Sequence, residues 1–426
     1  MLASSAAPWA MIQKTLNYFT RSKWLKLAAT GVLSLVAIVY LTTGFYYLAI
    51  AKNSAIQTPA ALFSPGFHSQ GSPIDFKLRR VEAKMFMERI NPYDVFDKQS
   101  LSKKPLRYQS RLNDLVFITG TPIAVSGYPL WSFPLFVLFF TPFLSCELSR
   151  FVFALMNLGA LFFIYKRLYQ HAASWLGRAD SHLVCLSCLA LNSWYITLHN
   201  GQISILLAFG LILSLPWRIS SFFGKVLGNI LLSLKATFGF YPLLINFFRS
   251  KWQTLFSALC VFILWGGSAL WLQDSPFLFL RQMFLVPTQG SIGLPELFSS
   301  CHLPKAPLLI SFFILGFFFT LWIVFFHRSD AFTKLALSLL LMRLFCYHQI
   351  YDNVMVFLAI AQLGVRALQT KNITITSVWL STALAFVLPS SVLNPRLMPW
   401  FYNAFCILAF VTIYISEPSS QKPQRN

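Results

Sequence analysis

The sequence has few charged residues for its length, and acidic residues are the scarcest of them. Charged side chains make up 11% of the 426 residues, with 13 Asp and Glu against 34 Lys and Arg, whereas a typical soluble domain is about 25% charged. Hydrophobic residues make up 56%, more than one soluble core of this size can enclose. The composition excludes an ordinary soluble domain and predicts an integral membrane protein, for which lipid is the apolar solvent.

Several chemical signatures are also missing. The seven cysteines form no disulfide framework, and Cys185 and Cys188 lie inside an apolar run without the further ligands that zinc needs. No GxxxxGK[ST] loop, HExxH or DxD pair occurs. These absences argue against an ATP-driven pump and against a metal-dependent nucleotide-sugar enzyme, and no cofactor is expected. The first 20 residues lack the layout of a cleavable signal.

Apolar runs recur along almost the whole chain. They cover residues 24–50, 151–166, 181–198, 203–217, 223–234, 236–248, 252–272, 306–326, 331–347, 350–365, 373–388 and 397–415. Several are shorter than the roughly 20 residues of a full span, so broken helices inside a bundle are expected. We predict an all-α polytopic membrane protein, with roughly 10–13 transmembrane helices in a single domain.

The basic residues predict the orientation of the chain. Lys14, Arg21, Lys23 and Lys26 place the N-terminus in the cytoplasm by the positive-inside rule. Alternation then puts about 17 Lys and Arg in cytoplasmic links and the tail 416–426, against about five in the short outer loops. We expect a multi-pass protein with both termini in the cytoplasm, in a bacterial cytoplasmic membrane or, with the same topology, in the endoplasmic reticulum.

One apolar stretch, 128–145, would reverse the predicted membrane orientation of every later helix if it crossed the bilayer. Pro129, Pro134 and Pro142 can break a helix in this stretch. The charge asymmetry therefore favours a re-entrant segment or a bent pair of half-helices.

The loop 51–127 is expected to face outward, with a second outer loop at 273–305, because long loops translocate regardless of charge. Within it, 76–90 reads as a helix that lies along the membrane surface, with Arg79 and Arg80 near lipid phosphates. The basic excess is assigned to topology and to anionic membrane lipids, and no nucleic-acid partner is expected. Without a soluble domain, any active site must lie at or within the membrane.

Charged and imidazole side chains gather at the predicted outer ends of the helices, where such groups mark functional cavities. They are Asp75, Asp94, His199, Lys235, His302, His348, Asp352 and Arg396. Asp75 is suited either to act as a general base on a hydroxyl or to cap the helix that follows. Asp94 ends the motif Asn-Pro-Tyr-Asp, where formation of a turn is the favoured role.

Two further motifs add polar groups on the same side. Tyr128 and Pro129 predict a helix start with an aromatic anchor at the interface. The segment His-Asn-Gly-Gln, from His199 to Gln202, predicts a turn whose imidazole and amide can bind phosphate or sugar hydroxyls, or which only connects two helices.

Two motifs involve charges within apolar sequence. Lys235 lies between two apolar runs and needs a partner or an anion such as phosphate, unless it snorkels to the interface. His348 and Asp352 lie four residues apart on one helical face, where they can form an ion pair or share a site. They are too few for a metal site.

The order of these motifs resembles glycosyltransferase family 87, a group of multi-spanning GT-C enzymes that use polyprenyl-phosphate mannose. The residues that carry the resemblance are Asp75, Asn91-Pro92-Tyr93-Asp94, Tyr128-Pro129, Gly201-Gln202, Lys235 with Pro242, and His348. Two positions depart from the family pattern, with Leu130 in place of a second proline and Ser204 in place of asparagine.

The resemblance implies a GT-C-like bundle that moves a hexose, mannose above all, from a polyprenyl-phosphate donor to a lipid or glycan acceptor. It implies that Asp75 is the catalytic base and that the reaction inverts the anomeric carbon, because a single displacement needs only one carboxylate. The implied substrate contacts are Asp94, Tyr128, His199, Gln202, Lys235, His348, Asp352 and Arg396.

A transporter or flippase for a lipid-linked or anionic substrate is the alternative. Segments interrupted by Gly and Pro, together with intramembrane cations, fit that class equally well. Many transporters carry repeated halves, and this sequence shows none, since the long first loop has no second copy.

Overall fold

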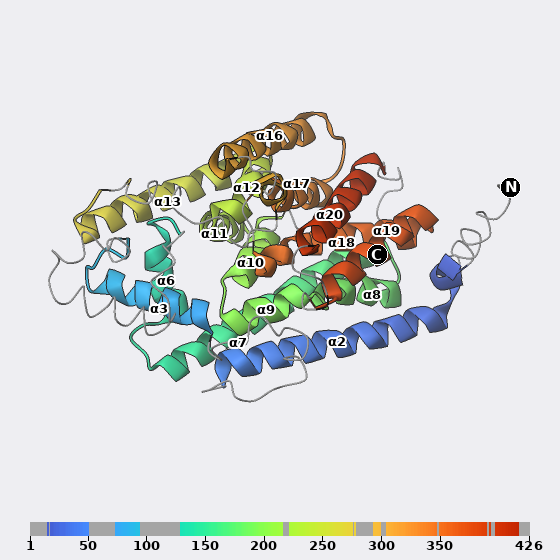
Figure 1. The fold of residues 1–426 in the computed structure, drawn as a ribbon, viewed down its shortest axis with the longest axis horizontal. Helices are drawn as coiled ribbons and strands as arrows, with labels where there is room; N and C mark the ends of the chain where they lie inside the picture. Colours follow the sequence, from blue (N-terminus) through green and yellow to red (C-terminus); the bar gives the residue numbers. More distant parts are fainter. Residues whose placement is uncertain are drawn as a thin grey trace.

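The computed structural model describes residues 15–16, 18–50, 73–93, 128–215, 221–275, 277, 293–299, 304–346, 349–389, 392 and 397–416. Every element among them is a helix, which confirms the predicted all-α class, and Figure 1 shows them as one elongated bundle. Most of the two predicted outer loops and the predicted tail lie outside the described residues.

The first part of the bundle contains one long helix at its edge and a group of shorter ones. These helices are α2 (Lys23–Ala49), α3 (Ile74–Met87), α6 (Ser132–Phe140), α7 (Cys146–Ala173), α8 (Arg178–Leu189), α9 (Asn192–Asn200), α10 (Ser204–Ser214), α11 (Phe222–Ser233), α12 (Ala236–Arg249) and α13 (Lys251–Leu272). Serines begin three of them, because the hydroxyls of Ser22, Ser145 and Ser221 each accept an amide hydrogen bond from the first turn.

The second part completes the bundle. It contains α15 (Leu294–Ser299), α16 (Lys305–Phe326), α17 (Ala331–Phe345), the 3-10 helix η4 (Ile350–Val356), α18 (Phe357–Thr370), α19 (Ile373–Val387) and α20 (Met398–Ile415). Each predicted apolar run coincides with one helix or with a consecutive pair. The pairs are α8 with α9 and η4 with α18.

The helices differ in whether they can cross a bilayer unaided. Among the described residues, six are long and apolar enough, or seven when α8 and α9 are counted as one span bent by 47°. The helices α10, α11 and α19 are apolar but shorter. The chain is therefore a multi-pass membrane protein, and the larger predicted number counts short bundle helices as well as full spans.

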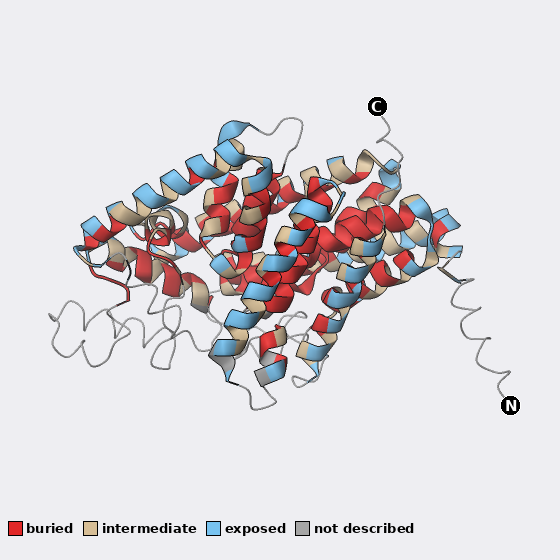
Figure 2. Cartoon of the chain, turned by 90° about the horizontal axis from the view of Figure 1, so that it is seen from above, coloured by how far each residue is buried: buried red, intermediate tan, exposed pale blue. Residues whose placement is uncertain are grey.

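The outer surface of the bundle is apolar. Figure 2 shows buried residues along the inner helix faces and exposed ones outside. Large hydrophobic side chains are exposed there, including Trp252, Leu270 and Phe162. Exposure of this apolar surface to water would be unfavourable, whereas lipid tails cover it without a free-energy penalty.

Helix ends alternate between two faces of the bundle. At the C-terminal end of α2, Arg150 of α7 donates to the Leu48 carbonyl oxygen at 2.7 Å. At the N-terminal end of α2, Lys26 pairs with Asp180 of α8 at 2.9 Å. We name the first end the site face and the second the opposite face. Helices α2 and α7 thus run between these two faces in opposite directions.

The stretch 128–145 returns to the face from which it starts. At its beginning, the Arg79 guanidinium of α3 lies 4.7 Å from the centre of the Tyr128 ring. Near its end, Arg80 of the same helix donates to the Leu144 carbonyl oxygen at 2.6 Å. The short helix α6 lies between these contacts and packs on α3. Both ends are therefore held at the site face, as a re-entrant segment requires.

Helix α3 has the predicted position in the chain but not the predicted surroundings. Arg79 and Glu82 are buried and form an ion pair at 2.5 Å, and Arg80 bonds to carbonyl groups of the re-entrant segment. The expectation that Arg79 and Arg80 face lipid phosphates is wrong. Both face protein, because α3 packs against α6 and α9 rather than lying free on the membrane.

Candidate active site

The candidate active site is built around the first turn of α3. Asp75 is the second residue of this helix, and Pro73 holds the capping position before it. The helix-capping alternative for Asp75 is therefore wrong. The Gln202 side chain lies close enough to the carboxyl to lower its pKa by hydrogen bonding, and Asp75 remains partly exposed. A substrate hydroxyl can thus reach it.

Gly201 sets the distance between these two residues. It ends α9 with φ of +69°, in the left-handed region that glycine enters without strain. A Cβ there would lie 3.2 Å from both the N and the Cα of Phe76, and closer to the Phe76 Cβ. The α9–α10 turn therefore presses directly on the start of α3, and only glycine lets Gln202 approach Asp75.

A buried ion pair borders the carboxylate on α3 itself. Arg79, one helical turn after Asp75, binds Glu82 and lies over the Tyr128 ring. The Tyr128 hydroxyl lies 3.4 Å from the Gln202 amide oxygen. One cluster thus contains three of the predicted residues, Asp75, Tyr128 and Gln202. It also contains the Arg79 cation.

The charges of this cluster shift the acidity of the carboxyl. Burial raises the pKa of Asp75 above its ordinary value, and the negative charge of Asp352 adds to the rise. The cations of Arg79 and Lys235 and the Gln202 hydrogen bond lower the pKa without cancelling the rise. Asp75 is therefore a stronger base than an ordinary aspartate, while the nearby cations still favour its charged form.

Lys235 and Asp352 form the second part of the site. The Lys235 ammonium donates to both Asp352 carboxylate oxygens, at 2.6 and 2.7 Å. Ser204 donates to the first of these oxygens at 3.1 Å, and the Gln349 amide to the second at 3.2 Å. Lys235 also lies 5.0 Å from the centre of the Tyr351 ring. The predicted need of Lys235 for a partner is met by a carboxylate.

His199 is at the same end of α9 but serves packing. Its ring lies edge-on to Tyr47 of α2, with ring centres 4.8 Å apart, and near Tyr195 at 5.7 Å. One imidazole nitrogen is 3.1 Å from the Asn200 amide oxygen. The contact with Tyr47 holds the end of α9 against α2.

The described part of the Asn-Pro-Tyr-Asp motif, Asn91 to Tyr93, forms a turn. The Asn91 side chain accepts from the Tyr93 amide at 3.0 Å and donates to Asp274 at 2.6 Å. The Tyr93 hydroxyl donates to the Tyr128 carbonyl oxygen at 2.5 Å, so the turn supports the residue beside the site. Three predicted site residues lie outside the described residues and stay predictions: Asp94, His348 and Arg396.

Sequence reasoning missed Arg79 and Ser204 as site residues. Arg79 carried a usable signal, because residues four apart share a helical face and Asp75 lies four before it. Ser204, which departs from the family pattern, supplies a hydroxyl to Asp352. It therefore keeps a hydrogen-bond donor where asparagine is usual.

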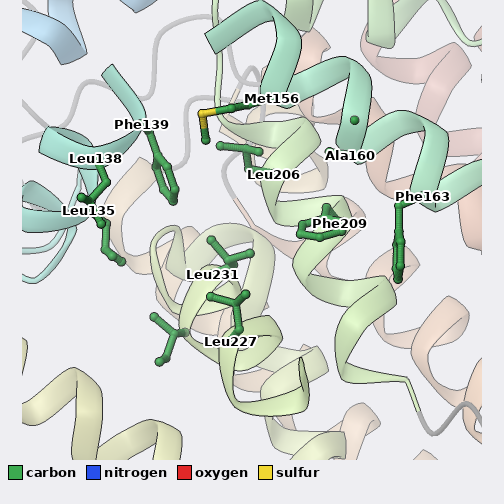
Figure 3. Close-up of a pocket in the computed structure, with 12 residues that line it drawn as sticks. Leu135, Leu138, Phe139, Met156, Ala160, Phe163, Leu206, Phe209, Leu227 and Leu231 are labelled. Atoms are coloured by element: carbon green, nitrogen blue, oxygen red, sulfur yellow. The ribbon is translucent and has the colours of Figure 1, made fainter. Parts of the chain in front are cut away.

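An apolar cavity lies among helices that lead to two residues of the polar cluster, Ser204 and Lys235. It has a volume of about 450 Å³ and lies among α6, α7, α10 and α11, as Figure 3 shows. Its walls include Leu206 and Leu231, close to Ser204 and Lys235 in the chain. Nearly all of its lining is hydrocarbon. Within the described ranges no group of three His, Cys, Asp or Glu could hold a metal ion, and Cys185 and Cys188 are free and buried.

The comparison with known families finds one match. The model for glycosyltransferase family 87 matches residues 133–347, which are 215 of the 426 residues. The matched region contains Gln202, Ser204 and Lys235 and the whole apolar cavity, whereas Asp75 and Asp352 lie on either side of it. No curated protein and no solved structure was found to match the chain.

Proposed function

Because the chain belongs to glycosyltransferase family 87, we propose that it transfers a hexose from a polyprenyl phosphate to a hydroxyl of a lipid or glycan. Mannose is the first sugar to test. The observation that carries the proposal is the position of Asp75. It is a partly exposed carboxylate with a raised pKa, near Gln202 and within the electrostatic reach of the Arg79 and Lys235 cations.

The reaction needs one base. Asp75 takes the proton of the acceptor hydroxyl while that oxygen attacks the anomeric carbon of the donor. The bond from the anomeric carbon to the phosphate oxygen breaks, and the polyprenyl phosphate leaves with the bonding electrons. Attack and departure occur on opposite sides of the sugar, so the configuration inverts. Phosphate is a good leaving group, and the reaction needs no general acid.

The cations suit the departing phosphate. Arg79 and Lys235 both act on the Asp75 charge, so both lie within electrostatic reach of a phosphate bound there. Each is already held by a carboxylate, Glu82 or Asp352, which fixes its position before the donor binds. Fixed cations stabilise developing charge better than mobile ones, because no reorganisation is needed during the reaction.

The apolar cavity fits the lipid part of the donor. It has almost no polar lining and is bounded by α10, which begins at Ser204, and by α11, which is followed by Lys235 at the start of α12. A polyprenyl chain has no polar groups, so a hydrocarbon channel next to a cationic site matches a lipid phosphate better than a soluble nucleotide sugar. The transport alternative has no such specific support, since the family is one of transferases.

The orientation follows from charge. The N-terminus of α2 lies at the opposite face and carries Arg21, Lys23 and Lys26. The positive-inside rule then places the opposite face in the cytoplasm and the site face outside. We infer a bacterial cytoplasmic membrane, with the donor presented at its outer leaflet.

A transfer assay tests the proposal. Purified full-length protein in nanodiscs would receive radiolabelled polyprenyl-phosphate mannose and native membrane lipids, with Asp75→Asn alongside. Glu88→Gln, at the other end of α3, is the matched control for loss of one carboxylate. We expect a labelled product with wild type and with the control but none with Asp75→Asn. Undiminished transfer by Asp75→Asn would show that the assigned base is wrong.

A further inference from the structure

A second and larger cavity lies at the opposite face, far from the candidate active site. It has a volume of about 1060 Å³ and is bounded by α2, α7, α8 and the end of α18. Along α2 it extends from Thr20 to Ser34, a length of about 20 Å for an α-helix. It is larger than the roughly 300–1,000 Å³ of most small-molecule sites.

Basic side chains dominate its polar part. The lining contains five Lys and Arg and one carboxylate, namely Arg21, Lys23, Lys26, Arg178, Lys371 and Asp180. Lys26 is held by Asp180, with its ammonium 2.9 and 3.0 Å from the two carboxylate oxygens. The four other basic side chains are exposed. The cavity therefore has an excess of positive charge that is not balanced by its own lining.

The start of α8 adds to this preference for anions. Gly177 caps the helix and lines the cavity, and no side chain caps the first amides. A helix N-terminus without a side-chain cap favours a negative group. Arg178 and the first amides of α8 thus both favour an anion in this cavity.

Apolar side chains also line the cavity. Leu27, Leu186 and Leu368 line it together with the Tyr165 ring. The polar groups there are partly used, since the Tyr165 hydroxyl lies 2.5 Å from an imidazole nitrogen of His182. The cavity thus combines a cationic mouth with an apolar interior along α2, a candidate membrane-spanning helix.

We propose that this cavity binds an anionic phospholipid, with the phosphate among Arg21, Lys23, Arg178 and Lys371 and an acyl chain along α2. A free phosphate would satisfy the charges but leave the apolar interior empty. The positive-inside rule explains basic residues at this face, but not their convergence on a cavity. The bound lipid would join α2 to α8 and α18 and so brace the first helix of the bundle.

Native mass spectrometry of the full-length protein in detergent can test this site. The probes are phosphatidylglycerol, phosphatidylcholine and glycerol 1-phosphate. The cavity variant is Arg21→Gln/Lys23→Gln/Lys371→Gln, which leaves the Lys26–Asp180 pair intact. The matched control, Lys225→Gln/Lys251→Gln/Arg328→Gln, removes the same charge at the opposite face but outside the cavity.

We expect phosphatidylglycerol to bind more tightly than phosphatidylcholine. The cavity variant should weaken phosphatidylglycerol binding by about fivefold for each charge removed, and the control should not. Ser34→Trp leaves the charges in place but fills the apolar interior, so it should also weaken lipid binding.

Three results would overturn the proposal: equal loss in the cavity variant and the control, equal binding of the two lipids, or displacement of phosphatidylglycerol by glycerol 1-phosphate at similar concentration. The last would indicate a site for soluble anions. Sugar transfer is measured separately at the site face, so failure here leaves the proposed function standing.

Discussion

Replacing Gly201 with alanine tests the contact that holds the candidate base in position. An alanine at φ of +69° costs about 1–2 kcal/mol in backbone strain. Its methyl group would also lie 3.2 Å from the Phe76 N and Cα and closer to the Phe76 Cβ, where carbon atoms need about 3.5–4.0 Å. The start of α3 must therefore retreat by something on the order of 1 Å.

On the proposed function this shift of α3 changes the catalytic geometry, because Asp75 precedes Phe76 and lies near Gln202, which follows Gly201. A displacement of about 1 Å in a catalytic group can lower the rate about a hundredfold. We therefore expect Gly201→Ala to lose about two orders of magnitude in kcat but only about 1–2 kcal/mol of stability.

The assay compares sugar transfer and thermal unfolding in the same nanodisc preparation. Gly266→Ala and Gly267→Ala are matched controls, because a Cβ at either position meets nothing within 4 Å. Both lie inside helices, where alanine is slightly preferred to glycine, so both should keep activity and stability. Full kcat in Gly201→Ala would refute the claim that the α9–α10 turn positions Asp75.

Three further variants probe charge and shape. Arg79→Gln should move the acid limb of the pH–rate profile to higher pH. Activity needs ionised Asp75, and the Arg79 cation lowers the raised pKa of Asp75. An unmoved limb would mean that Asp75 is not the titrating base. Lys235→Met should lower the free energy of unfolding by about 3–5 kcal/mol, measured by chemical denaturation, because it leaves the Asp352 charge buried without its partner. The double variant Lys235→Met/Asp352→Leu should regain part of this loss. Equal stability of the two variants would contradict the ion pair. Ala160→Trp, which fills the apolar cavity, should raise KM for a long polyprenyl donor more than for a short-chain donor, and equal effects would place the lipid elsewhere.

The helices could be predicted from the sequence because hydrophobicity alone marks them. Every predicted run became a helix, including the short runs at α10, α11 and α12. Their close packing could not be predicted, since it depends on which glycines face each other. A Cβ on Gly210 would lie 2.9 Å from the Gly228 carbonyl oxygen, so α10 and α11 touch through their backbones.

Most residues of the candidate site could be predicted from the sequence, but the contacts between them could not. Polarity within apolar sequence singled out Lys235 and Asp352, yet 117 residues separate them, and no local pattern links them. The surroundings of Arg79 were predicted wrongly for a related reason. A basic residue on an amphipathic helix ordinarily faces lipid phosphates, and its true surroundings depend on Tyr128, which reaches it only through the fold.

The charges of the site bear on how the donor is held. The described cluster contains three carboxylates, on Asp75, Glu82 and Asp352, and two cations, on Arg79 and Lys235. A donor phosphate therefore enters a cluster whose cations are already paired, and it adds further negative charge. Lys235 can serve it by sharing its protons between Asp352 and the phosphate.

This sharing would favour the transition state over the bound donor. Asp352 keeps the Ser204 and Gln349 hydrogen bonds while Lys235 shares its protons with the phosphate, so the carboxylate is not left without donors. As the sugar–phosphate bond breaks, charge grows on the phosphate and the attraction for Lys235 rises with it. An interaction that strengthens along the reaction lowers the barrier, whereas one of constant strength only tightens binding. On the proposed function, the Lys235–Asp352 pair therefore holds in place a cation whose attraction for the phosphate grows as the bond to the sugar breaks.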